Sequence, residues 1–162
     1  MRRLDEVPRA DRVYLDEAGV DDTLCFAWGY SLRGLRCLAQ RLGHRTSRVS
    51  MAAAWCCGEV LAPLTFQGYC TSELIESWFE QQLIPALRPG QVVILDNASF
   101  HRIQVLRPLV EAAGCQLWPL PRYSPDLNEI EHLWPKLKTR IALDENFYPC
   151  FHDKVDAAFC SL

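Results

Sequence analysis

The fold prediction starts from residues 91–96, which read QVVILD and place four consecutive apolar residues directly before an acid. A short apolar run without alternation is typical of a strand that is buried on both faces. Strands of this kind occur in sheets that carry helices on both sides. We therefore predict a strand at 91–95 with Asp96 at its carboxyl end.

The segments on either side of this strand predict an α/β protein. A cap at Thr71 begins a helix that runs to about Leu87, and a late helix begins near Asn128 and ends at about Leu143. A further helix at 103–113 and a strand at 115–119 lie between them. Earlier in the chain, short β-type runs predict strands at 12–15, 24–31, 48–57 and 59–66. We expect one mixed sheet, an antiparallel meander followed by parallel strands, with helices on both faces.

Composition narrows the class of protein. The chain has 162 residues, 49% of them hydrophobic, and a formal net charge of −3, which fits one domain and excludes a disordered chain. It has no apolar run of membrane-spanning length and no secretory signal. Its eight cysteines include no CxxC pair, so we interpret them as reduced thiols rather than disulfides or zinc ligands. These features predict a cytoplasmic protein.

Two aspartates are predicted at the carboxyl ends of strands, where α/β sheets commonly bind ligands. Asp16 and Asp96 each follow an apolar strand run, and the carboxyl ends of strands in open α/β sheets share a crevice. Each aspartate could also serve only as a turn residue or a helix cap. Glu129 and Glu131 lie in the first turn of the late helix, where they could simply complement the helix dipole.

Three motifs resemble the catalytic motifs of mariner-superfamily DDE transposases, most closely the bacterial insertion-sequence branch. They are Asp16-Glu17, DNASFH at residues 96–101 and YSPDLNEIEHLW at residues 123–134. The spacing from Asp96 to Glu131 also matches the superfamily. The resemblance implies an RNase H-like fold spanning residues 1–162 as a single catalytic domain. It further implies that Asp16, Asp96 and Glu131 are the catalytic carboxylates. Glu129 occupies the family's usual proline position and is the alternative ligand.

Phosphoryl transfer explains the need for these residues. Clustered carboxylates repel one another unless a cation neutralises them, so the set predicts hard divalent metal ions. We expect two Mg²⁺ ions, which Mn²⁺ can replace, with Asp16, Asp96 and Glu131 as their ligands. Water would be the nucleophile for cleavage, and the freed 3′-hydroxyl the nucleophile for joining. Asn97, His101 and Asn128 are expected to support the site, although helix capping explains His101 and Asn128 equally well.

Basic residues outline an expected DNA surface despite a sequence pI of about 5.8. Two clusters contribute to it: Arg33, Arg36, Arg41, Arg45 and Arg48, and then Lys136, Lys138 and Arg140. The partners implied by the resemblance are the element's DNA ends and a TA-containing target, with a homodimer assembled on DNA.

Only about fifteen residues precede Asp16, where relatives carry helix-turn-helix domains. We therefore expect the catalytic half alone, with a separate or frameshift-fused N-terminal half. Two alternative functions remain. One is a non-catalytic fragment that associates with DNA or with full-length transposase. The other is an RNase H-like nuclease outside transposition.

Overall fold

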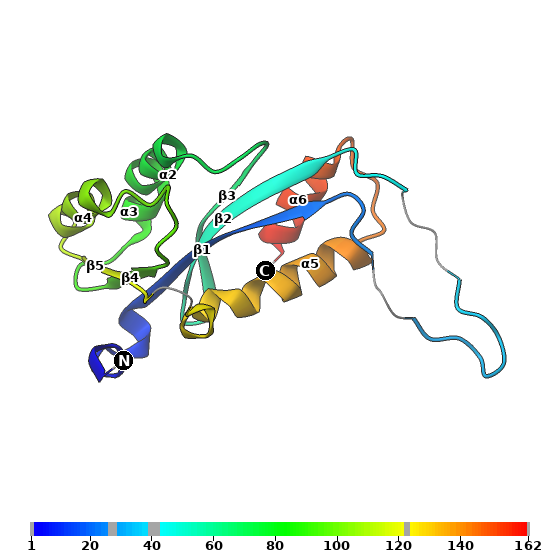
Figure 1. Ribbon diagram of the computed structural model, residues 1–162, viewed down its shortest axis with the longest axis horizontal. Helices are drawn as coiled ribbons and strands as arrows, with labels where there is room; N and C mark the ends of the chain where they lie inside the picture. The colour runs from blue at the N-terminus through cyan, green and yellow to red at the C-terminus, as the bar shows by residue number, and fades with distance from the viewer. Residues whose placement is uncertain (1, 26–28, 39–42, 122–123, 162) are drawn as a thin grey trace.

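Strand β1 (Arg12–Asp21) lies at the centre of a five-stranded sheet whose order is β3-β2-β1-β4-β5. On one side, β2 (Arg48–Cys56) and β3 (Glu59–Phe66) continue the sheet in antiparallel orientation. On the other side, β4 (Val92–Leu95) and β5 (Gln116–Pro119) run parallel to β1. The predicted mixed sheet is therefore confirmed (Figure 1).

The computed structural model of the protein describes residues 2–25, 29–38, 43–121 and 124–161. The helix predicted at 71–87 is continuous but consists of three pieces, an α-helix, a π-helix and a final α-helical turn. The late helix begins as a 3-10 turn at Glu129 and becomes α-helical at Leu133. The helical elements are α1 (Arg2–Asp5), η1 (Arg9–Asp11), α2 (Ser72–Trp78), η2 (Phe79–Leu83), α3 (Ile84–Ala86), α4 (Ile103–Ala112), η3 (Pro125–Leu127), η4 (Glu129–His132), α5 (Leu133–Leu143) and α6 (Phe151–Cys160).

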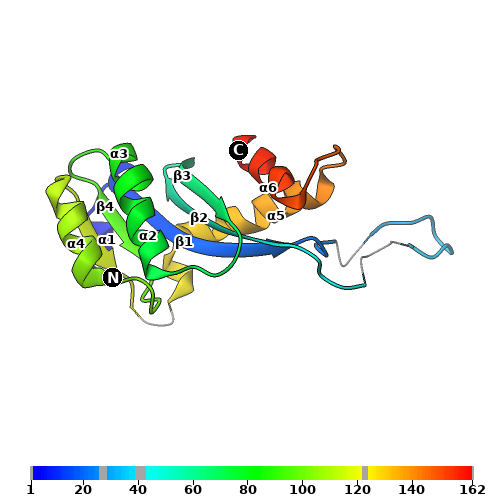
Figure 2. The ribbon, with the colours of Figure 1, turned by 90° about the horizontal axis from the view of Figure 1, so that it is seen from above.

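Each face of the sheet supports its own hydrophobic core. Side chains alternate along a strand, so Val93 and Leu95 of β4 pack on one face with α2, η2 and α4. Val92 and Ile94 pack on the other face with α5 and α6. All four β4 residues are buried, as the apolar run predicted. Figure 2 shows α2 and α4 grouped together at the left, and α5 and α6 grouped together to their right. Helices on both faces are thus confirmed.

The N-terminal part of the sheet differs from the prediction. β1 does not end in a turn after Leu15, because residues 14–21 pair with residues 48–55 of β2 in an unbroken antiparallel ladder. Asp16 therefore lies in the middle of β1 and not at its carboxyl end. The small side chains of Ala18 and Gly19, which resemble a turn signal in the sequence, lie opposite Met51 and Ser50.

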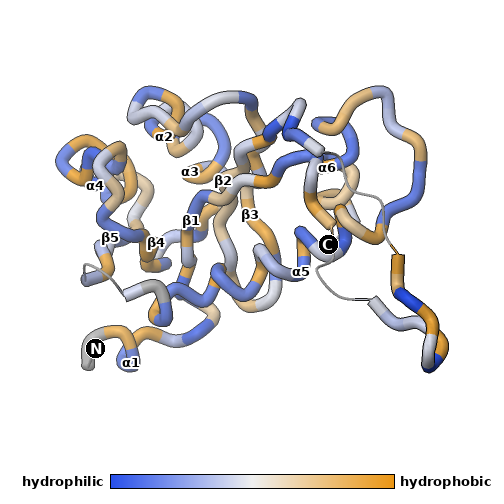
Figure 3. Tube along the Cα trace, turned by 45° about the vertical axis from the view of Figure 1, so that its right-hand side comes forward, coloured by the Kyte–Doolittle hydropathy of each residue, from blue (hydrophilic) through white to orange (hydrophobic). Residues whose placement is uncertain are grey.

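The strand predicted at 24–31 is wrong for the residues that the structure describes, since 24–25 and 29–31 form no strand; residues 26–28 lie outside them. β1 already pairs with β2 on one side and β4 on the other, so this segment finds no place beside it. Instead, the described parts of the connection between β1 and β2 extend away from the sheet (Figure 1). Figure 3 shows both hydrophobic and hydrophilic residues along these described parts. Within the described residues, no helix combines the length and the apolar composition that a membrane span requires.

Candidate functional site

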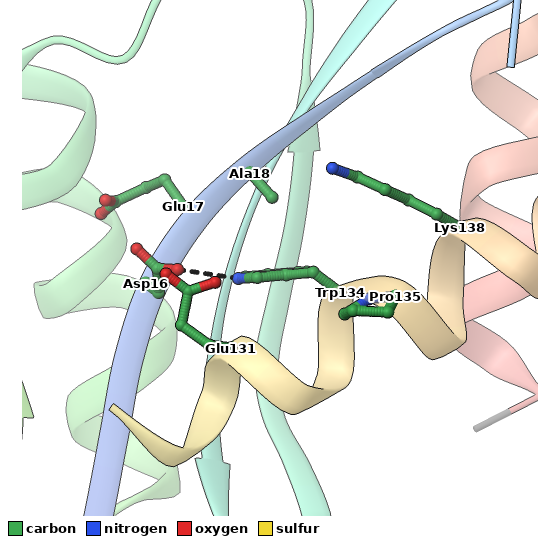
Figure 4. Close-up of a pocket in the computed structure, with 7 residues that line it drawn as sticks. All are labelled: Asp16, Glu17, Ala18, Glu131, Trp134, Pro135 and Lys138. Carbon is green, nitrogen blue, oxygen red and sulfur yellow. Dashed lines mark hydrogen bonds between the residues drawn. The ribbon is translucent and has the colours of Figure 1, made fainter. Parts of the chain in front are cut away.

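Asp16 and Glu131 lie in the same pocket, although they come from opposite ends of the sequence. The pocket has a volume of about 470 Å³ and lies between β1 and the start of α5. In Figure 4 the carboxylates of Asp16 and Glu131 lie side by side, with the amino group of Lys138 on the far side of Trp134. The lining residues are Asp16, Glu17, Ala18, Glu131, Trp134, Pro135 and Lys138.

Helical spacing explains how one segment supplies most of this lining. Residues three, four and seven positions apart share a helix face, and Glu131, Trp134, Pro135 and Lys138 follow that spacing. The apolar residues of this segment recur at helical spacing and hold it against the sheet. Ile130, Leu133, Trp134, Leu137 and Ile141 are all buried.

The Trp134 indole holds the carboxylate of Asp16. Its Nε1–H donates a hydrogen bond of 2.8 Å to Oδ2 of Asp16. Burial raises the pKa of Asp16 to about 7, and the negative charges of Glu17 and Glu131 add to this rise, while the Trp134 hydrogen bond opposes it. Sequence reasoning missed this role of Trp134; its spacing of three from Glu131 is the signal that could have placed it beside the site.

This raised pKa predicts a pH-dependent stability for the protein without metal. Between pH 3.8 and about 7 the native state keeps a proton on Asp16 that the unfolded chain loses. The free energy of unfolding should therefore fall as pH rises across this range. Asp16→Asn should remove that contribution and flatten the slope. Urea unfolding of both proteins at several pH values, with a chelator present, measures it; identical slopes would contradict the prediction.

Asp96 follows β4 directly, but it does not line the pocket of Asp16 and Glu131. Its Oδ1 lies 2.9 Å from Nδ1 of His101 and accepts a 2.9 Å hydrogen bond from the Ala98 amide. The His101 hydrogen bond is the main reason that the pKa of Asp96 lies below its usual value. The other ring nitrogen of His101, Nε2, lies 2.8 Å from Oε1 of Glu17.

His101 is thus buried between two carboxylates. Its side chain has no exposed surface. Burial alone would lower the pKa of His101, but the hydrogen bonds to Asp96 and Glu17 outweigh that effect and raise it to about 10. The ring therefore carries a positive charge at neutral pH. It belongs to the Asp96 part of the site and does not cap α4, which has no side-chain cap.

The two asparagines make structural hydrogen bonds near the acids. Asn128 is buried, and its Nδ2 donates a 3.0 Å hydrogen bond to the Leu15 carbonyl, directly before Asp16. Its Oδ1 has no hydrogen-bond partner within the described residues. It does not cap η4 with its side chain. Asn97 donates from Nδ2 to the Leu120 carbonyl and so fastens the segment after β4 to the end of β5.

Glu129, the alternative ligand in the sequence analysis, points elsewhere. Its Oε1 lies 3.3 Å from the Arg9 guanidinium and 3.4 Å from the Tyr14 hydroxyl, which donates to it. It does not line the pocket. The structure therefore groups Glu131, and not Glu129, with Asp16.

The oxygen donors of the pocket suit a divalent metal ion. Among the described residues, no three His, Cys, Asp or Glu side chains are grouped closely enough to form a metal site by themselves. Asp16 and Glu131 do provide two neighbouring carboxylates, whose mutual repulsion a cation would relieve. Oxygen donors of this type suit hard cations such as Mg²⁺ or Mn²⁺. The pocket therefore fits a divalent ion held by these two residues.

The basic residues of the predicted DNA surface do not lie in one common environment. Lys138 lines the pocket, and within the described residues it has no ion-pair partner. Arg140 donates to the Ser161 carbonyl at the far end of α6. Arg48 lies across Gly19, where an added Cβ would come within 2.5 Å of its guanidinium. Arg41 lies outside the described residues. The others, all exposed, are Arg33, Arg36, Arg45 and Lys136.

Comparisons with known proteins identify relatives of this fold. A family model described as DDE superfamily endonuclease matches residues 11–153. The Mos1 strand transfer complex has a TM-score of 0.74 at 19% identity, covering 96% of this chain and 48% of that chain. The Mos1 mariner paired end complex with Mn gives 0.71 at 16% identity, with 99% and 51% covered. The catalytic domain of Mos1 mariner transposase gives 0.64 at 14% identity, with 99% and 75% covered. No match was found among curated protein sequences.

These likenesses confirm the predicted RNase H-like fold, since the mixed sheet and its helices superpose on the Mos1 catalytic domain. The chain spans about half the length of the Mos1 chains in the strand transfer and paired end complexes. The family match spans β1, β4 and α5, the elements that hold Asp16, precede Asp96 and follow Glu131.

Proposed function

We propose that this chain, which belongs to the DDE superfamily endonuclease family, is the catalytic domain of a DNA transposase. It would cleave DNA strands and join the freed 3′-hydroxyl to target DNA during transposition of a bacterial insertion sequence of the mariner superfamily. The observation that carries this proposal is the pocket that brings Asp16 of β1 and Glu131 of η4 together and that Lys138 also lines.

A DDE-type domain implies the use of divalent metal ions. Asp16 and Glu131 would hold them, with Asp96 as the third ligand, and we propose two Mg²⁺ ions that Mn²⁺ can replace. When bound, such ions activate the attacking oxygen and stabilise the leaving oxygen of an in-line displacement at phosphorus. The side chains of this chain supply negative charge at fixed positions, which is what those ions require.

The remaining pocket residues prepare these carboxylates. Trp134 fixes the orientation of Asp16 through its indole N–H. Asn128 fastens the segment that begins η4 to the Leu15 carbonyl, so that Asp16 and Glu131 are held on neighbouring elements. Lys138 places a positive charge at the edge of an acidic pocket, where it would bind a DNA phosphate. The proposed partners are therefore element ends and a TA-containing target, with a homodimer and a helix-turn-helix half recognising the ends.

A joining assay tests this function. A short fluorescent duplex with a free 3′-hydroxyl end is incubated with the protein, Mg²⁺ and a supercoiled target plasmid. A transposase catalytic domain joins the fluorescent strand to the plasmid. Plasmid cleavage without joining would instead support an RNase H-like nuclease. Binding of DNA with neither reaction would support the non-catalytic fragment.

Lys138 provides a separate test of the DNA contact. Lys138→Gln should weaken duplex binding by about 3- to 10-fold at low salt and reduce the salt slope of log K by about 1, because one phosphate contact is lost. Lys136→Gln is the matched control, since Lys136 is exposed two residues away and does not line the pocket. Fluorescence anisotropy over a salt series measures both. Equal effects of the two substitutions would place the DNA elsewhere.

A further inference from the structure

Glu17 is adjacent to Asp16 in the sequence but serves the opposite face of β1. Successive side chains of a strand point to opposite faces, and Glu17, although it also lines the pocket, extends away from Trp134 in Figure 4. Asp16 accepts from Trp134 on the α5 side. The Glu17 side chain is only 12% exposed and reaches His101 instead. The neighbour of a proposed metal ligand is therefore engaged in a contact of its own.

The imidazole of His101 connects Glu17 to Asp96. Nε2 lies 2.8 Å from Oε1 of Glu17, and Nδ1 lies 2.9 Å from Oδ1 of Asp96. Since the ring is fully buried and both nitrogens face carboxylate oxygens, it has no free nitrogen with which to bind substrate or metal. The Phe100 ring packs edge-on against it, with centroids 4.7 Å apart. His101 is thus fixed on both sides.

This bridge lies where the backbone no longer ties the two strands. The parallel ladder between β1 and β4 ends at the pair Tyr14–Ile94, two residues before Asp16 and Asp96. Asp96 itself lies beyond the end of β4. The imidazole of His101 therefore connects the carboxylate of Asp96 to Glu17 on β1. It also occupies Oδ1 of Asp96, while Oδ2 has no hydrogen-bond partner within the described residues.

We propose that Glu17 is a positioning residue that acts through His101 to hold the Asp96 carboxylate in register with Asp16 and to leave Oδ2 of Asp96 for the metal. The inference rests on the proposed function, because it assumes that Asp96 binds metal. Carboxylate–histidine contacts behind a ligand commonly change metal affinity by 10- to 100-fold. Glu17 is thereby distinguished from Asp16, Asp96 and Glu131, which would touch the metal themselves.

The test compares Mn²⁺ binding and joining rate for the wild type and the Glu17→Ala, Glu17→Gln and Glu145→Ala variants. Glu145 is exposed and does not line the pocket, so Glu145→Ala is the control. Glu17→Ala should weaken Mn²⁺ binding 10- to 100-fold while duplex binding stays unchanged, and higher Mn²⁺ concentrations should restore joining. Glu17→Gln should recover most of the lost affinity, because its amide oxygen still accepts from Nε2–H of His101.

Two results would overturn the inference. If Glu17→Gln abolished Mn²⁺ binding, Glu17 would itself be a ligand. If folded Glu17→Ala bound Mn²⁺ like the wild type, Glu17 would have no positioning role. A wild type that neither binds Mn²⁺ nor joins DNA would refute the proposed function instead.

The bridge can also be followed without metal, in the nitrogen NMR signals of the His101 ring. The Nε2 signal should shift in Glu17→Ala, because Nε2 loses the carboxylate oxygen 2.8 Å away, whereas the Nδ1 signal should move less, because Nδ1 keeps its contact with Asp96. A Glu17→Ala spectrum identical to that of the wild type would overturn the inference independently of activity.

Discussion

Asp16→Asn is expected to lower the rate of DNA joining by about a thousandfold or more while leaving the protein folded. The substitution removes a negative charge that would hold metal, but an amide oxygen can still accept the hydrogen bond from Trp134. Because Asp16 lies in a partly buried position that penalises its charge, the neutral residue should not destabilise the metal-free protein. The joining assay with Mg²⁺ measures the activity, and thermal unfolding verifies the fold.

The control for this experiment is Asp153→Asn. Asp153 is an exposed carboxylate in the first turn of α6, and it does not line the pocket. This variant should join DNA at the wild-type rate. Full activity in Asp16→Asn would remove the pocket from the proposed mechanism, whereas equal losses in both variants would indicate a general effect of charge on DNA binding.

Leu137→Ala should lower the free energy of unfolding by about 2–5 kcal/mol, because it removes a large side chain from a packed core and leaves a cavity. Leu137 has no exposed surface and belongs to the core that α5 and α6 form with the sheet. It lies on α5 between Trp134 and Lys138, so its loss should also loosen the wall of the pocket. Urea denaturation measures the stability change.

Lys136→Ala is the comparison, since Lys136 is an exposed neighbour on the same helix. Its substitution should change the free energy of unfolding by no more than about 0.5 kcal/mol. A similarly small change in Leu137→Ala would mean that α5 is not packed on the sheet in solution. The position of Glu131 and Lys138 against β1 would then lose its structural basis.

The local sequence pattern predicted those helices and strands whose own side chains specify them. The apolar run at 92–95 specifies β4 because every side chain in it must be buried, and two cores provide for that. The periodic spacing of Ile130, Leu137 and Ile141 similarly specifies the buried face of the late helix. The two-residue connection between β2 and β3 specifies an antiparallel pair, whereas β1 and β2 are antiparallel across a long connection that does not specify it.

Long-range pairing decided what these patterns could not. The run DEAGV at 16–20 resembles a turn, yet it is strand, because β2 supplies a continuous partner. The aromatic run near residue 24 resembles a strand, yet the described part of it has no ladder to join. A strand is stabilised by hydrogen bonds to another segment, so its extent depends on residues that local sequence does not reveal.

The candidate site likewise has features that the sequence determined and features that only the tertiary structure decided. The sequence determined which residue types this protein can offer, namely Asp16, Asp96 and Glu131 in motifs that resemble a known catalytic set. The tertiary structure alone decided that Trp134 holds Asp16, that Glu129 turns to Tyr14, and that Glu17 reaches Asp96 through His101. The physical reason is that each contact joins segments distant along the chain, and only the packing of helices on the sheet brings them within hydrogen-bond distance.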